Sequence, residues 1–263
     1  MKVEDVLAKH LDSIGTKEKR AEIKNQTMFF NVQFIIKNSA SVGNGKAILF
    51  SEGNKNLWGV NLNSNDYPTD KFSYDGKNAK IGYIRPGFRS ILGGFIVSYN
   101  ELLEDGLLGG TLASSWTLLN ADVKKSKISF EGTKEIDGNE TFVLSYLPKG
   151  GSDLNIKMYF DKQNYRHVRT DYNRIIAARQ GQTVDGSAGQ GEDRYRLTED
   201  FSNFQNMGGL TLPGTYRLFY SHTSTAALRL AQNSNREIEY KFNLTNFSYN
   251  QRVEQNAFDI DAK

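Results

Sequence analysis

Alternation of hydrophobic and polar residues dominates the chain from Thr27 onward, and this period of two predicts β-strands. It is clearest near the C-terminus, where Ile238, Tyr240 and Phe242 face one way and polar side chains lie between them. The predicted strands are 28–36, 45–50, 57–62, 71–74, 79–84, 127–136, 141–147, 154–160, 165–176, 194–204, 215–220 and 237–247. Such alternation is typical of an antiparallel sheet that buries one face.

Residues 1–15 follow a helical period instead. The apolar stripe comprises Val3, Val6, Leu7, Leu11 and Ile14. Its spacing of three and four residues places the stripe on one helix face, and Gly15 follows where a left-handed C-cap is common. His10 lies beside the stripe and is interpreted as structural. The basic run 17–20 is interpreted as a solvated helix end.

A second helical pattern interrupts the strands between residues 88 and 120 and predicts a two-part helical lid. The first stripe comprises Phe95, Tyr99, Leu102 and Leu103, and the second comprises Leu108, Leu112, Trp116 and Leu119. The pair Gly109-Gly110 costs roughly 1 kcal/mol per glycine relative to alanine inside a helix. It therefore indicates either a hinge within 106–110 or the end of one helix, with Thr111 capping the next.

Composition excludes several classes of protein. The 33 basic and 30 acidic side chains of this 263-residue chain leave a net charge of +3, without the concentrated basic stripe of a nucleic-acid-binding protein. The absence of cysteine excludes disulfides, thiolate metal sites and a cysteine nucleophile. The most apolar window carries Glu101, Glu104 and Asp105, which argues against a transmembrane segment. No signal peptide is visible, so we expect either a cytosolic protein or a mature chain with an added Met.

The sequence contains no convincing catalytic or metal-binding pattern. The three histidines, His10, His167 and His222, lack a metal-ligand spacing, and His167 is predicted on an exposed face because arginines flank it. A glycosidase pair is conceivable among Glu192, Asp193, Glu199 and Asp200. Alternating charges on an exposed strand are the favoured interpretation of this group. We therefore predict no catalytic residues, no metal ligands and no cofactor.

The elements together predict a mainly β fold with a helical lid (α+β). Residues 1–263 are expected to form a single domain, an unclosed antiparallel β-barrel of about a dozen strands with an N-terminal helix (1–15) and a helical insertion (88–120). The glycine-rich segment 180–191 has no periodicity and is expected to be a mobile loop. One face of the sheet is expected either to be wet or to line a cavity.

Four segments in their order resemble the outer-membrane lipoprotein carrier (LolA-like) superfamily of bacterial envelope proteins. They are VLAKHLDSIG (6–15), ELLEDGLLGGTLASSW (101–116), GGLTLP (208–213) and NAF (256–258). The resemblance implies helices that act as a lid over an apolar cavity for acyl chains, and export to the periplasm or cell envelope after loss of a signal peptide. The carrier's strand arginine that holds its lid shut has no match, since the second strand offers only Lys46.

Three functions follow as hypotheses. The first is non-enzymatic binding or transport of a lipid or lipoprotein acyl ligand, with an envelope protein as a further candidate partner. Its predicted ligand-binding residues are Phe95, Tyr99, Leu102, Leu103, Leu107, Leu108, Leu112 and Trp116. The second is an envelope scaffold with a filled barrel, and a carbohydrate-active enzyme is a weaker third. A large apolar cavity beneath 102–116 would support the first, whereas a packed interior would remove it.

Overall fold

The computed structural model describes residues 2–37, 41–65, 67–120, 127–178, 191–225, 235–254 and 256–261. Its strands are β1 Asn25–Ile36, β2 Ser41–Glu52, β3 Lys55–Leu62, β4 Thr69–Tyr74, β5 Ala79–Ile81, β6 Lys127–Ile136, β7 Asn139–Leu147, β8 Asn155–Asp161, β9 His167–Ile176, β10 Asp193–Met207, β11 Leu210–Ser224 and β12 Arg236–Tyr249. Its helices are α1 Val3–Ile14, α2 Lys17–Glu22, α3 Ile91–Ser98 and α4 Glu101–Glu104, with 3₁₀ turns at Gly110–Leu112 (η1) and Thr117–Asn120 (η2).

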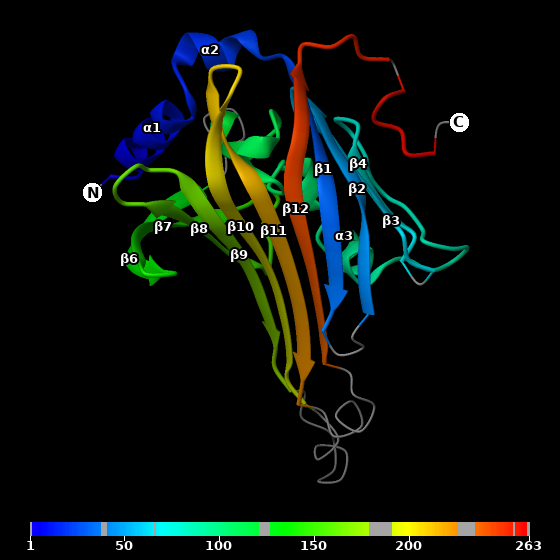
Figure 1. The fold of residues 1–263 in the computed structure, drawn as a ribbon. Helices are drawn as coiled ribbons and strands as arrows, with labels where there is room; N and C mark the ends of the chain where they lie inside the picture. The colour runs from blue at the N-terminus through cyan, green and yellow to red at the C-terminus, as the bar shows by residue number, and fades with distance from the viewer. Residues whose placement is uncertain are drawn as a thin grey trace.

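All described strands belong to one antiparallel sheet with the order β5-β4-β3-β2-β1-β12-β11-β10-β9-β8-β7-β6. Neighbours in the sheet are neighbours in the chain except at the centre, where β1 pairs with β12. The first and last strands of the chain therefore join two meanders into one surface. The sheet stays open because its edges, β5 and β6, are not paired with each other. It curves around α3 and the turns that follow it (Figure 1).

The predicted fold class, an open antiparallel barrel with a helical lid, is confirmed. Each predicted strand coincides with an observed strand, and most observed strands extend beyond the predicted ends. The predicted strand 79–84 is shorter in the structure and ends at Ile81. The basic run 17–20 does not end the first helix. It begins the separate helix α2, because the Thr16 hydroxyl accepts a hydrogen bond from the Lys19 N–H and caps it. The predicted loop 180–191 lies outside the described residues except for Gly191.

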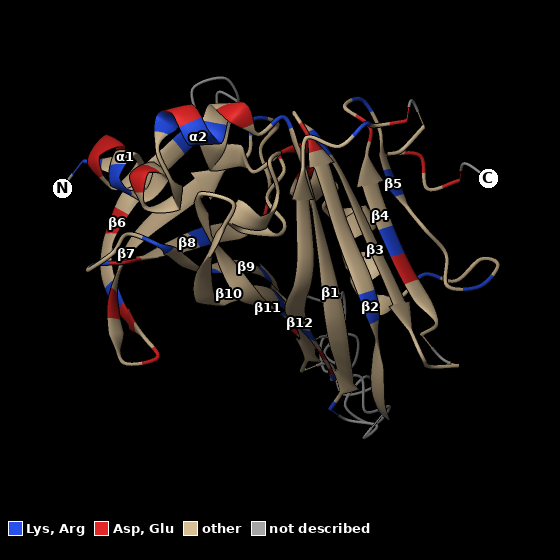
Figure 2. Cartoon of the chain, turned by 45° about the horizontal axis from the view of Figure 1, so that its top comes forward, with Lys and Arg blue, Asp and Glu red and all other residues tan. Residues whose placement is uncertain are grey.

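The two faces of the sheet differ in chemistry. The concave face carries the apolar positions of each strand, such as Phe30, Tyr216 and Phe242, which are all buried against the insertion. Figure 2 shows charged residues on α1 and α2 and at intervals along the strands. On the convex face Arg217 links neighbouring strands by donating to Asp200 Oδ2 at 2.9 Å and to Glu239 Oε1 at 2.9 Å. No helix of the described residues is long and apolar enough to span a membrane.

Candidate functional site

The insertion that follows β5, residues 88–120, lies against the concave face, and we call it the lid. Only its first half is α-helical, in α3 and α4, with a break near Tyr99 and Asn100. The predicted second helix is absent, and residues 106–119 form turns and two 3₁₀ segments. The reason is the backbone of three glycines. Gly106, Gly109 and Gly110 have φ of 61°, 83° and 50°, which is left-handed backbone that a helix cannot contain.

Side chains of the sheet satisfy the irregular backbone of the lid. Gln26 donates to the carbonyls of Thr111 and Leu112, the latter at 2.5 Å, and Asn56 donates to the Leu103 carbonyl at 2.9 Å. Buried backbone groups outside regular structure need such partners. These contacts fix the lid to β1 and β3. Lys46 has no part in this, because its ammonium group donates to Asn31 on β1.

The most buried of these contacts is made by Glu199 at the centre of β10, which is 0% exposed. Its Oε1 accepts hydrogen bonds from the Gly109 N–H at 2.6 Å and from the Tyr216 hydroxyl at 2.7 Å. Its Oε2 lies 2.7 Å from the Tyr172 hydroxyl, which also donates to the Leu107 carbonyl. Burial raises the pKa of Glu199 to about 7, although these hydrogen bonds oppose the rise.

A second buried carboxylate, Asp70 on β4, holds the beginning of the lid. It accepts a hydrogen bond from the Tyr240 hydroxyl at 2.8 Å and another from Ser90. Ser90 is also the N-cap of α3, where its Oγ accepts from the Gly93 N–H at 2.8 Å. Burial raises the pKa of Asp70 to about 6. One carboxylate therefore anchors the start of the lid and another anchors its tightest turn.

The predicted ligand-binding residues are all buried and share one hydrophobic core. They are Phe95, Tyr99, Leu102, Leu103, Leu107, Leu108, Leu112 and Trp116. Leu102, Leu103, Leu112 and Trp116 are 0% exposed, and a void of only about 10 Å³ remains between the lid and β3, β4 and β11. The lid side chains thus fill the concave side, and the large cavity beneath residues 102–116 that would have supported ligand binding there is not present among the described residues.

An aromatic cluster joins α1, the lid and the sheet. The ring of Trp116 stacks on that of His167 at 4.9 Å and meets the edge of His10 at 5.1 Å. His167 is 1% exposed, so its predicted place on an exposed face is wrong. The register shift between Tyr159 and Phe160 changes the pairing of β8 with β9, and His167 turns inward there. Burial lowers the pKa of His10 to about 4 and holds the pKa of His167 well below its ordinary value.

Beside the lid lies an open groove of about 760 Å³, which we call the helix groove. Its apolar walls come from α1 and the α1–α2 region (Leu11, Ile14, Ile23), from β11 (Leu210, Leu212) and from the end of the lid (Leu119). Ala8 and Ala21 add small exposed side chains, and Lys17, Arg20 and Lys24 are also part of the lining. The lid itself forms one wall through Thr111 and Ser114.

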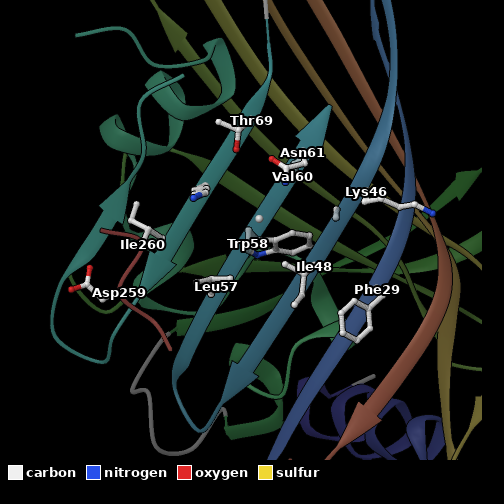
Figure 3. Close-up of a pocket in the computed structure, with 13 residues that line it drawn as sticks. Phe29, Lys46, Ile48, Leu57, Trp58, Val60, Asn61, Thr69, Asp259 and Ile260 are labelled. Atoms are coloured by element: carbon white, nitrogen blue, oxygen red, sulfur yellow. The ribbon is translucent and has the colours of Figure 1, made fainter. Parts of the chain in front are cut away.

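A second hollow, of about 390 Å³, lies on the convex face of β2–β4. Figure 3 shows Phe29, Ile48 and Leu57 on its strand side and Ile260 of the C-terminal segment on the other. The segment is held there because the Phe258 ring stacks on Phe50 at 4.8 Å. This hollow is smaller than the helix groove, and neither the lid nor α1 contributes to its lining.

The carboxylates considered as a glycosidase pair do not form one. Glu199 points to the concave side, whereas Asp200, the next residue, pairs with arginines on the convex side. Asp193 lies 3.0 Å from His222, and Glu192 pairs with Arg194. The interpretation of all four as exposed strand charges is wrong for Glu199. Within the described ranges, no group of three or more His, Asp or Glu side chains is arranged to hold a metal ion.

The two buried carboxylates that hold the lid were not identified from the sequence, although strand alternation indicates their position. Glu199 lies between Leu197 and Phe201 at alternating positions of β10, and this parity alone places it on the buried face. Asp70 has the same relation to Phe72 on β4. The helix groove has no such signal, because it is assembled from α1, α2, β11 and the lid, which are far apart in the chain.

Comparison with known proteins identifies the fold. No protein-family model matches the chain, and no curated protein does so either. Among solved structures, a LolA superfamily protein from Nitrosomonas europaea matches with a TM-score of 0.50 and 11% identity, over 99% of both chains. A provisionally named outer membrane lipoprotein-sorting protein domain from Vibrio parahaemolyticus has a TM-score of 0.47 and 15% identity over 97% of both chains. A DUF1329 family protein from Desulfovibrio piger has a TM-score of 0.44 and 10% identity over 98% of both. The chain therefore has a LolA-like fold.

Proposed function

We propose that this protein binds a hydrophobic ligand with a single acyl chain, without catalysing a reaction, and that the chain lies in the helix groove. The observation that carries this proposal is the groove itself. Its volume of about 760 Å³ falls within the roughly 300–1,000 Å³ of small-molecule sites. Leu11, Leu210 and Leu212 give it an apolar floor, and it is open to solvent beside α2.

Burial of methylene groups supplies the affinity. Each buried CH₂ contributes about 0.8 kcal/mol, so a chain of moderate length binds without any polar contact. The groove also lies between α1 and the lid, two elements that a ligand could separate without breaking a strand pair. A site of this kind permits both binding and release, as transport requires.

We further propose that the eight buried lid residues line an extension of the groove when the lid lifts. Three features support this. Thr111, Ser114 and Leu119 of the lid already form a groove wall. The seated lid keeps an ionisable carboxyl, Glu199, in its interface. The ring nitrogen Trp116 Nε1 is buried without a hydrogen-bond partner in the described structure, which costs about 1–3 kcal/mol. A long acyl chain would then replace lid side chains on the concave face.

The LolA-like fold supports a place of action in the periplasm or cell envelope, and an acylated ligand or an envelope protein as partner. The filled-barrel scaffold remains the second candidate. It is favoured by one observation, the packed interior between the lid and the sheet. The two proposals differ in whether the purified protein takes up a fatty acid.

The test is titration with cis-parinaric acid, a fluorescent fatty acid, and native mass spectrometry of the same samples. Ala8→Trp places a large ring in the groove from an exposed helix position, and therefore leaves the core intact. Ile175→Trp is the matched control, since Ile175 is 61% exposed and is not part of the groove. We expect saturable binding by the wild type and the control, weakened about tenfold (1.4 kcal/mol) in Ala8→Trp. Absence of saturable uptake by the wild type would favour the scaffold.

A further inference from the structure

The basic and acidic residues of helix α2 differ in their position relative to the helix groove. Lys17, Arg20 and Ala21 have the spacing i, i+3 and i+4, share one helix face and line the groove. Glu18 and Glu22 lie outside the groove lining. Cationic side chains thus gather on the groove side of a short helix whose acidic side chains face elsewhere.

The cations are held at the groove rim in different ways. Arg20 is fixed, because its guanidinium donates to the Leu11 carbonyl at 2.6 Å and also to that of Gly15. Lys24 donates to the Ala21 carbonyl at 2.9 Å. Lys17 has neither an ion pair nor a hydrogen bond to any residue that the structure describes, so its charge is available.

One carboxylate shares this rim. Asp12 lies 4.0 Å from Arg20 and is 80% exposed, so water weakens that pair. The lining of the groove contains no other Asp or Glu, and its cations outnumber its acids. Lys19, which lies outside the lining, is instead paired with Glu22 at 2.7 Å. The rim therefore has an excess of positive charge beside an apolar floor.

We infer that the ligand is an amphiphile with one acyl chain and an anionic head, a carboxylate or a phosphate. The chain covers Leu210 and Leu212, and the head lies at the rim between Lys17 and Lys24. This inference rests on the proposed function and specifies its ligand class. Charge-assisted hydrogen bonds to carboxylate or phosphate oxygens give the head its preference for this rim.

Three ligands with the same palmitoyl chain test the inference: palmitate, palmitoyl lysophosphatidate and the uncharged 1-palmitoylglycerol. Their affinities are measured for the wild type and for Lys17→Glu/Lys24→Glu, at low and high salt. Both lysines are exposed, so the variant retains the core. The matched control is Lys77→Glu/Lys149→Glu, which changes the net charge equally at exposed positions outside the groove.

We expect the wild type and the control to bind at least one anionic ligand about tenfold more tightly than 1-palmitoylglycerol. This difference in affinity should decrease at high salt. Preference for palmitate alone identifies a carboxylate head, and preference for the lysophosphatidate alone identifies a phosphate head. Lys17→Glu/Lys24→Glu should lose the preference for the anionic ligand and keep its affinity for 1-palmitoylglycerol. Equal wild-type affinity for all three would overturn the inference and leave hydrophobic binding intact. Failure of all three to bind would overturn the proposed function as well.

Discussion

Glu199 Oε1 accepts a 2.6 Å hydrogen bond from the backbone N–H of Gly109, and this contact joins the centre of the sheet to the tightest turn of the lid. Both partners are buried, and the glycine has a φ of 83°. Ionisation of the Glu199 carboxyl group should therefore make the packing of the lid on the sheet depend on pH.

Glu199→Gln should remove most of the pH dependence of stability near neutrality. The folded pKa of about 7 lies above the unfolded value near 4.5, so the stabilising contribution is complete below pH 4.5 and is lost as pH rises through 7. This rise of the Glu199 pKa from its ordinary value to about 7 corresponds to roughly 3 kcal/mol. Because glutamine can donate to Tyr172 and accept from Gly109, the variant should gain stability at pH 8 and change little at pH 5.

Denaturant unfolding at pH 5, 6, 7 and 8 measures this effect. Asp70, whose pKa is raised to about 6, contributes a smaller slope of the same sign that persists in the variant. Glu135→Gln, on the exposed edge strand β6, is the control and should keep the wild-type profile. An unchanged slope between pH 6 and 8 in Glu199→Gln would show that this carboxyl does not govern the lid.

Gly109→Ala should destabilise the protein more than an equivalent change elsewhere. A Cβ at Gly109 would lie 2.6 Å from the Trp58 ring and 3.2 Å from Leu49, so overpacking adds about 1–3 kcal/mol to the cost of left-handed backbone. Gly138→Ala is a matched control, since Gly138 also has a φ of 83° but no atom within 4 Å of the added Cβ. Equal unfolding free energies for the two variants would contradict the close packing of the lid.

A disulfide between Ser51→Cys and Ser114→Cys should fix the lid to β2. The two hydroxyl oxygens lie 3.0 Å apart, and the chain has no other cysteine that could compete. If long chains extend beneath the lid, oxidation should weaken stearate binding about tenfold and leave decanoate binding nearly unchanged. The reduced form of the same variant is the control. Loss of both ligands, or of neither, would contradict an extension of the groove beneath the lid.

The strands and the open sheet could be predicted because they depend on a local pattern, alternation, which each segment carries by itself. The α1 stripe was predicted correctly for the same reason, and its residues Val6 and Ile14 are buried. The second half of the lid was mistaken for a helix. Leu108, Leu112 and Trp116 do have helical spacing, but left-handed glycines decide the backbone there, and their conformation depends on Trp58 and Glu199 from distant strands.

The predicted site was only partly accessible to sequence reasoning. The apolar lid residues were identified as inward-facing, but a hydrophobic stripe has the same sequence whether it covers a ligand or fills a core. The structure has the filled arrangement in this conformation. The helix groove depends on how α1, α2, β11 and the lid come together, which no periodicity encodes. Only this arrangement places the cations Lys17, Arg20 and Lys24 at the groove.

Photo-crosslinking with a palmitate analogue that carries a diazirine at its chain end reports where the acyl chain lies, and it therefore tests whether the helix groove holds the ligand. We expect saturable labelling, displaced by excess palmitate, on peptides from α1 and α2 and on residues 210–212, with less labelling in Ala8→Trp. Labelling that palmitate does not displace, or that falls on the convex strands around Ile48 and Leu57, would contradict it.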